Sequence, residues 1–321
     1  MNPTEFIDVN NRDASTLTFQ RIDLAAAFAA PPPPLDFIWP GFLAGTVGVL
    51  SSPGGSGKSL WALEALCAVS GGRGADLLDL RPTASGRGVY LCLEDPYSIL
   101  LYRLYGLSQQ LDSASRARLT ESCDVYPLRG LARLDLRDRR HRDSIARALD
   151  GVRIAVIDTL SRAHAGDENS NAEMALLLTG LEWICERTGC AILLLHHTRK
   201  GGPGESREAQ QAARGASALI DNARWGAQLM RMSETEAETM ADAERSLDPL
   251  QPCRIRERRG FYVRLDASKV NYGPPEEVRW YRREEGGVLV PARLEYMPTA
   301  LKSGGAQASK VVPWRGRPAS E

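Results

Sequence analysis

The chain has 321 residues, 43% hydrophobic and 25% charged, enough apolar content for the core of one large α/β domain. Its 40 basic and 40 acidic side chains give a formal net charge of zero, so any nucleic-acid surface must be a local patch. No apolar run approaches the ~20 residues of a membrane span, and the polar N-terminus has no signal-peptide pattern, so we expect a cytoplasmic protein without a membrane partner.

The first 34 residues are predicted to form an N-terminal arm and a proline-rich tether. The four prolines at 31–34 cannot lie in a helix interior or a central strand. The main domain is predicted over residues 35–298, and the small, polar and basic residues 299–321 are predicted to form a disordered tail.

The cysteines lack C-x-x-C spacing and lie mostly in apolar runs, which predicts reduced core thiols of a cytosolic protein and neither a disulfide framework nor a zinc site. They are Cys67, Cys92, Cys123, Cys185, Cys190 and Cys253.

Short apolar runs alternate with helical patterns in the main domain, which predicts an α/β fold with a mostly parallel sheet flanked by helices. A polar, glycine-rich loop follows residue 195, an acidic helix is expected near 234–247, and further strands with hairpins are expected over 260–273. The strands are predicted at 47–50, 89–93, 124–127, 154–157 and 191–195, and the helices at 58–70, within 97–119, at about 139–149 and at 172–187.

The stretch VLSSPGGSGKSL at residues 49–60 is typical of a phosphate-binding loop between a strand and a helix. Its glycines let backbone amides surround phosphate oxygens, and the helix that follows adds its positive dipole end. Lys58 is expected to reach the β and γ phosphates of a bound nucleotide, and Ser59 to ligate Mg²⁺. Ser52 replaces the first glycine of the motif, where a small residue suffices. The predicted nucleotide-binding residues are Pro53, Gly54, Gly55, Ser56, Gly57, Lys58 and Ser59.

The alternative to a nucleotide site is a glycine-rich turn with an exposed lysine. The apolar strand before the loop and the helix after it disfavour that alternative, because they are the context that the motif requires.

Acidic residues follow two of the apolar strands. Asp158 ends the run AVID and is expected to hold the metal ion; the alternative is a helix N-cap. Glu94 and Asp95 end the run VYLCLED, and a carboxylate there can orient the water that attacks the γ-phosphate. Glu94 is our choice of base, and Asp95 remains an alternative.

Two histidines end the most apolar strand. The side chains of His196 and His197 point to opposite faces, so only one can readily face the phosphates; the alternative is a pair of structural histidines. The polar loop that follows them, at 198–214, suits either a nucleic-acid backbone or solvent. Its basic residues are Arg199, Lys200, Arg207 and Arg214.

In order, these motifs resemble those of the RecA-like ATPases of DnaB-type hexameric helicases, and more closely the RepA replicative helicases of small broad-host-range plasmids. The resemblance runs from about residue 31 to 281. Its motifs are PPPPLDFIWPGFLAGTVGVLSSPGGSGKS, VYLCLEDP, AVIDTLSRAH, ILLLHHTRKG, ARGASALIDNARW and SKVNYG.

The resemblance implies a RecA-like P-loop core with ATP and Mg²⁺ as cofactors. By position it assigns ATP·Mg²⁺ binding to Lys58 and Ser59, metal support to Asp158, the catalytic base to Glu94 and a γ-phosphate sensor to His197. It also implies a homohexameric ring around single-stranded DNA, which Arg199, Lys200 and Arg207 would contact, and a primase or origin-binding partner.

One position departs from the family pattern. In SKVNYG, Lys269 matches the lysine of a basic pair, but Asn271 stands where many relatives have arginine. An arginine finger must therefore come from elsewhere, and Arg214 is our first candidate.

Three functions compete at this point. They are an ATP-driven DNA helicase for plasmid or mobile-element replication, an ATPase switch that binds a protein partner without unwinding DNA, and a nucleotide-binding module with negligible turnover.

Overall fold

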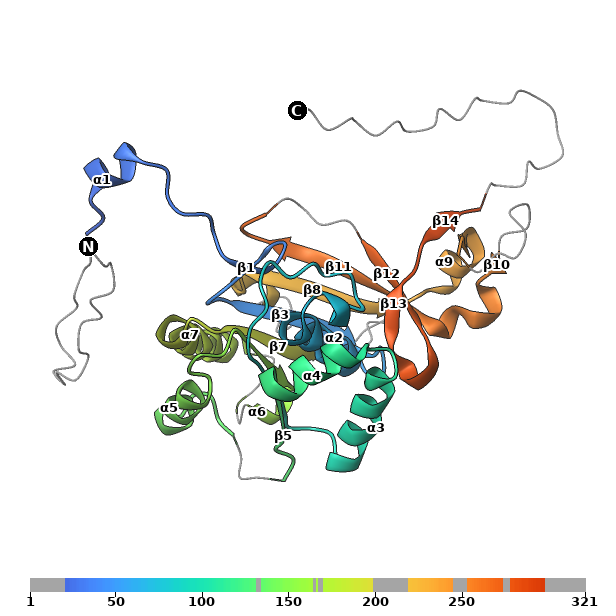
Figure 1. Cartoon of the computed structure of the whole chain (residues 1–321), viewed down its shortest axis with the longest axis horizontal. Coiled ribbons are helices and arrows are strands. Elements are labelled where there is room, and N and C mark those ends of the chain that lie inside the picture. The colour runs from blue at the N-terminus through green and yellow to red at the C-terminus, as the bar shows by residue number, and fades with distance from the viewer. Residues whose placement is uncertain are drawn as a thin grey trace. The chain divides into compact units, whose positions relative to one another are not determined.

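The computed structural model describes residues 21–130, 134–163, 166, 170–198, 219–244, 253–273 and 278–297 (Figure 1). The chain divides into two compact units, Met1–Leu35 and Asp36–Glu321. In the first unit, the described part contains the short helix α1 (Leu24–Ala29), which begins where the carboxylate of Asp23 accepts hydrogen bonds from the amides of Ala25 and Ala26.

A sheet of nine strands forms the centre of the second unit, in the order β13-β12-β11-β8-β3-β7-β6-β4-β5. Six neighbours in that order, from β8 to β5, run parallel, and β11, β12 and β13 continue the sheet antiparallel. The strands are β3 (Val47–Pro53), β4 (Gly88–Cys92), β5 (Cys123–Pro127), β6 (Ile154–Asp158), β7 (Ala191–Thr198), β8 (Trp225–Arg231), β11 (Tyr262–Val270), β12 (Arg279–Arg283) and β13 (Leu289–Pro291).

Helices cover both faces of this sheet, so its parallel strands are apolar on both sides. Along β4, Tyr90 and Cys92 belong to one core, and Val89 and Leu91 belong to the other. The first core includes α2 (Lys58–Gly71) and α3 (Tyr97–Ser108), and α4 (Ser113–Ser122) packs against α2; the second core includes α5 (Arg139–Ala148), α6 (Leu160–Ala163) and α7 (Asn171–Thr188). This arrangement confirms the expected α/β fold with a central, mostly parallel sheet flanked by helices.

A cluster of aromatic rings packs against α2, the helix that begins at the end of the phosphate loop, and stabilises its position. Trp39 and Trp225 lie 5.5 Å apart in a T-shaped arrangement, and Trp61 of α2 stacks on Trp225. Gly48 of β3 leaves room for the cluster, because a Cβ there would lie 2.9 Å from the ring of Phe42. Trp39 and Phe42 come from the two-stranded sheet of β1 (Phe37–Trp39) and β2 (Phe42–Leu43).

The predicted acidic helix near 234–247 is wrong in its extent. The helix α9 (Glu234–Thr239) ends after six residues, and β9 (Met240–Asp242) follows at once. This strand pairs with β10 (Cys253–Arg254) and β14 (Leu294–Tyr296), so distant partners stop a helix that local composition would have continued. Residues 245–247 and the predicted tail at 299–321 lie outside the described residues.

The remaining predicted elements are present, with boundaries that differ by a few residues. The helical region expected within 97–119 is divided into α3 and α4, and short 3₁₀ turns occur at Arg73–Ala75, Arg256–Phe261 and Glu285–Gly287. Among the helices of the described residues, none combines the length and hydropathy needed to cross a bilayer.

Candidate active site

The loop between β3 and α2 adopts backbone conformations that require glycine. Gly55 has φ +72° and Gly57 has φ +100°, both in the region that side chains with a Cβ rarely adopt. A Cβ at Gly57 would also lie 2.5 Å from Nη2 of Arg283, and a Cβ at Gly55 would lie 2.6 Å from Nη2 of Arg231. The glycines of the sequence motif are therefore needed for the loop's shape and for the close approach of two arginines.

A cavity of about 340 Å³ opens beside this loop. It lies where the carboxyl ends of β3, β4 and β7 meet, which is where ligands bind in open parallel sheets. It brings together most of the residues predicted from three separate motifs. The lining residues are Ser52, Gly55, Ser56, Gly57, Lys58, Ser59, Leu60, Glu94, Asp95, Arg103, His197 and Arg283.

Some of the predicted residues lie elsewhere. Pro53 and Gly54 belong to the loop but are not among the cavity's lining residues, and Gly54 is exposed. Asp158 is fully buried at the end of β6. The predicted DNA contacts Arg199, Lys200 and Arg207, and the predicted arginine finger Arg214, lie outside the described residues.

Lys58 is a buried cation without a hydrogen-bond partner in the described part of the chain. Its side chain is 3% exposed, and its Nζ lies 3.8 Å from Oδ1 of Asp158. Burial lowers the pKa of Lys58, and the nearby carboxylates of Asp158, Glu94 and Asp95 oppose that shift. A desolvated ammonium with free donors fits the oxygens of a phosphate, which would supply both hydrogen bonds and charge.

Asp158 has one satisfied oxygen and one free oxygen. Its Oδ2 accepts a hydrogen bond of 2.7 Å from the hydroxyl of Tyr90, and its Oδ1 has no hydrogen-bond partner in the described residues. Burial and the carboxylate of Asp158 raise the pKa of Tyr90 well above its usual value, so the tyrosine stays a donor. The free carboxylate oxygen, with the hydroxyl of Ser59 at the start of α2, fits the oxygen ligands that Mg²⁺ prefers.

The two adjacent acidic residues after β4 have different partners. Oδ2 of Asp95 accepts a hydrogen bond of 2.5 Å from Arg103 of α3, and both side chains are mostly buried. Oε2 of Glu94 lies 3.3 Å from Nε2 of His197, and this pair is 43% and 39% exposed. Both carboxylates line the cavity, and Glu94, at 43% exposed against 22% for Asp95, is the more accessible of the two.

The two histidines occupy different surroundings, as their alternation along β7 requires. His197 lines the cavity, whereas His196 is 4% exposed and its Nδ1 has no hydrogen-bond partner in the described residues. Burial lowers the pKa of His196 to about 4, and the positive charge of Lys58 and the ring of His197 contribute to the same shift. His196 is therefore neutral in the folded protein at neutral pH.

We expect His196 to make the protein less stable in mild acid. Below the unfolded-state pKa of 6.5 the unfolded chain binds a proton that the folded chain does not bind until about pH 4. The free energy of unfolding should thus have its full value above pH 6.5. It should fall as the pH is lowered from 6.5 to about 4, by at most about 3 kcal/mol. Urea unfolding at about pH 7.5 and about pH 5 measures this difference.

His196→Leu should reduce that pH dependence, because it removes the imidazole whose pKa differs between the folded and the unfolded chain. An unchanged pH dependence in His196→Leu would contradict this interpretation.

Motif analysis missed three arginines that contact the site. Arg103 holds Asp95, Nε of Arg231 donates to the carbonyl of Gly55 at 3.2 Å, and Arg283 donates to the carbonyl of Ser56. Burial lowers the pKa of Arg283, and the charge of Arg231 adds to the shift. Arg231 is the last residue of β8, and Arg283 is the last residue of β12. A basic residue at a strand end was the only signal in the sequence for their place near the site.

A buried glutamate also escaped the motif analysis. Glu64 of α2 is fully buried, and its Oε1 accepts a hydrogen bond of 2.9 Å from the amide of Leu289 in β13. Burial raises the pKa of Glu64 well above its usual value. Glu64 thereby ties the helix of the phosphate loop to the edge of the sheet.

Lys269 and Asn271, where the family pattern has a basic pair, lie away from the cavity of the phosphate loop. Lys269 of β11 donates to the carbonyl of Asp221, and the amide of Asn271 donates to the carbonyl of Arg224 at 3.2 Å. Neither residue lines the 340 Å³ cavity.

Comparisons with known proteins identify a family for this chain and a similar solved structure. The model of an AAA domain family (AAA_25) matches residues 13–203, more than half of the chain. Among solved structures, the crystal structure of the RadB recombinase aligns over 78% of this chain and 90% of that chain, with 12% sequence identity and a TM-score of 0.45. The second likeness is too distant to support an argument about function.

Proposed function

The chain belongs to the AAA domain family, and from that premise we propose that it is an ATP-dependent DNA helicase. It would be a ring-forming RecA-like motor, a homohexamer that moves along single-stranded DNA during the replication of a plasmid or mobile element. The observation that carries this proposal is the contact between Glu94 and His197, because it joins the candidate base to the strand that leads into the basic segment after residue 198.

We expect the residues of the cavity, together with buried Asp158, to bind and hydrolyse ATP. The phosphate loop and Lys58 would bind the phosphates, because a buried ammonium without partners gains most from an anion. Ser59 and Asp158 would hold Mg²⁺, which supplies charge neutralisation at the phosphates when bound. Glu94 would accept the proton of the attacking water. The loss of the contact between Glu94 and His197 would then transmit the nucleotide state of the site to β7.

The test of the helicase proposal is ATP hydrolysis with and without single-stranded DNA at low and high salt. We expect DNA to raise the rate at low salt and salt to reduce that effect, because phosphate contacts release counterions. Displacement of a labelled strand from a forked duplex is expected under the same conditions. Hydrolysis that ignores DNA, with no DNA binding at low salt, would reject the proposal.

A second candidate is an ATPase switch that binds a protein partner without unwinding DNA. The observation that favours it is the exposed apolar side of α3, a helix that lies directly after Glu94 and Asp95. Large exposed side chains of this kind often mark contact surfaces. They are Tyr97, Leu101, Tyr102 and Tyr105.

Mass measurement with ATP and Mg²⁺ separates these two candidates further. A homohexamer supports the helicase, and a monomer whose ATPase rate does not respond to DNA supports the switch.

A further inference from the structure

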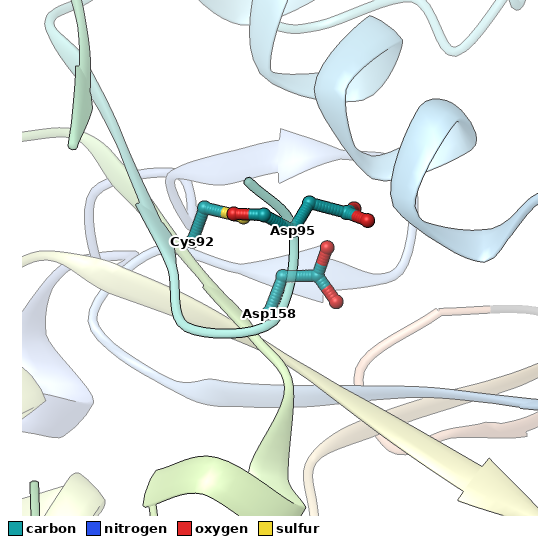
Figure 2. A group of neighbouring side chains, drawn as sticks. All are labelled: Cys92, Asp95 and Asp158. Atoms are coloured by element: carbon teal, nitrogen blue, oxygen red, sulfur yellow. The ribbon is translucent and has the colours of Figure 1, made fainter. Parts of the chain in front are cut away.

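The carboxyl ends of β4 and β6 place a thiol beside two carboxylates. Cys92 ends β4 and faces Asp158 in the parallel register, and Asp95 follows three residues after Cys92. The donor atoms of these three side chains all lie within 4.8 Å of one another (Figure 2). Figure 2 shows the two carboxylates pointing in the same direction, with the sulfur near the main chain of Asp95.

A separate observation indicates that this group lacks a ligand. Asp158 is 0% exposed, yet its Oδ1 has no hydrogen-bond partner in the described part of the chain. Cys92 is also 0% exposed, and its Sγ makes a long contact of 3.9 Å with the carbonyl of Asp95. A buried carboxylate oxygen normally accepts a hydrogen bond, and the ammonium of Lys58 at 3.8 Å from Oδ1 is too far to donate one.

We propose that Cys92, Asp95 and Asp158 form a binding site for a soft divalent cation of the Zn²⁺ class, which inhibits the nucleotide site. The proposal concerns a different ion from the Mg²⁺ that hydrolysis would use. A thiolate selects Zn²⁺ and Cd²⁺ over Mg²⁺, whereas carboxylates accept all of them. Binding breaks the S–H bond of Cys92, forms the metal–sulfur bond and releases the proton to solvent.

The geometry needs only a small adjustment to hold such an ion. Zinc–sulfur bonds of about 2.3 Å and zinc–oxygen bonds of about 2.0–2.2 Å put the donors of a tetrahedral ion about 3.5 Å apart. The three side chains would move closer together, Asp95 would exchange its ion pair with Arg103 for the metal ion, and a water molecule would complete four ligands. Cysteine spacing along the chain could not reveal the site, because Cys92 is its only cysteine and Asp158 lies in a different strand, β6.

Two cations compete with the proposed ion. Lys58 lies 3.8 Å from Asp158, and Arg103 is paired with Asp95. A divalent ion at the free oxygen of Asp158 would replace the weak contact with Lys58, and it would take the carboxylate that the nucleotide's metal ion needs. Inhibition follows from this shared use of Asp158.

Cadmium titration of the full chain without nucleotide tests the site directly. Thiolate-to-cadmium charge transfer gives an ultraviolet absorption band, and we expect it to saturate at one equivalent. Cys92→Ala should weaken this binding by about tenfold or more, as expected for the loss of a direct ligand. Cys123→Ser is the matched control and should retain the band, because its half-exposed thiol contacts Cys67 away from the site.

Each result has a defined meaning. No stoichiometric band in the wild-type chain would overturn the proposal, and so would a band that survives Cys92→Ala but is lost in Cys123→Ser. Cys92→Ser provides a second variant if Cys92→Ala shows a reduced melting temperature.

Zinc inhibition of the Mg²⁺-dependent ATPase, measured against each variant's own rate without zinc, should weaken by a similar factor in Cys92→Ala. The cadmium band does not require turnover, so it can fail independently of the proposed helicase.

Discussion

Replacement of Glu94 by glutamine is expected to reduce the rate of ATP hydrolysis by about 10²–10⁴-fold, the usual contribution of a positioned general base. Glutamine keeps the size and the hydrogen bonding of the side chain but cannot accept the proton of the water. ATP affinity should therefore remain close to that of the wild-type protein. Single-turnover hydrolysis and equilibrium binding of a fluorescent ATP analogue measure the two quantities separately.

The matched control is Asp95→Asn. It changes the neighbouring carboxylate, which the structure pairs with Arg103 at 2.5 Å, and we expect a smaller loss of turnover. If Asp95→Asn stops hydrolysis while Glu94→Gln does not, Asp95 is the base. Equal loss in both variants would mean that the two carboxylates act together, and the choice of Glu94 alone would be wrong.

Replacement of Lys58 by alanine is expected to weaken ATP binding by about 10–100-fold. One charge-assisted hydrogen bond contributes about 1.5–3 kcal/mol, and Lys58 offers donors that have no partner in the described residues. The stabilisation that ATP gives to the folded protein should fall accordingly. Thermal unfolding with and without saturating ATP measures this loss and also shows whether the variant folds.

Arg73→Ala is the control for Lys58→Ala. It removes an exposed positive charge from a 3₁₀ turn that does not line the cavity of the phosphate loop. We expect ATP to stabilise this variant as it stabilises the wild-type protein. Unchanged ATP affinity in Lys58→Ala would contradict the assignment of the loop.

Local sequence signals predicted the centre of the sheet well. The runs at β3, β4, β6 and β7 consist of residues buried on both faces, so each was readable as a strand from its composition alone. The phosphate loop was equally readable, because its glycines, Lys58 and Ser59 are adjacent in the chain. Parallel strands then bring their carboxyl ends to one edge, which explains why Glu94 and His197 were expected near the loop.

Pairings between distant segments were not readable in the same way. The contact between Arg231 and Gly55 spans 176 residues, and the contact between Arg283 and Ser56 spans 227 residues. Their position at a strand end is the only local signal that these arginines carry, and it does not indicate a contact with the phosphate loop. The end of α9 at Thr239 likewise depends on the partners of β9 in the folded chain.

The sequence by itself determined the class of the fold, the phosphate loop and the set of strand-end side chains, because these depend on residues close together in the chain. Only the tertiary structure decided which side chains meet. It separated Glu94 from Asp95 by pairing one with His197 and the other with Arg103. It also placed Cys92 beside Asp158, since strand register and side-chain packing are set by contacts between segments that are remote in sequence.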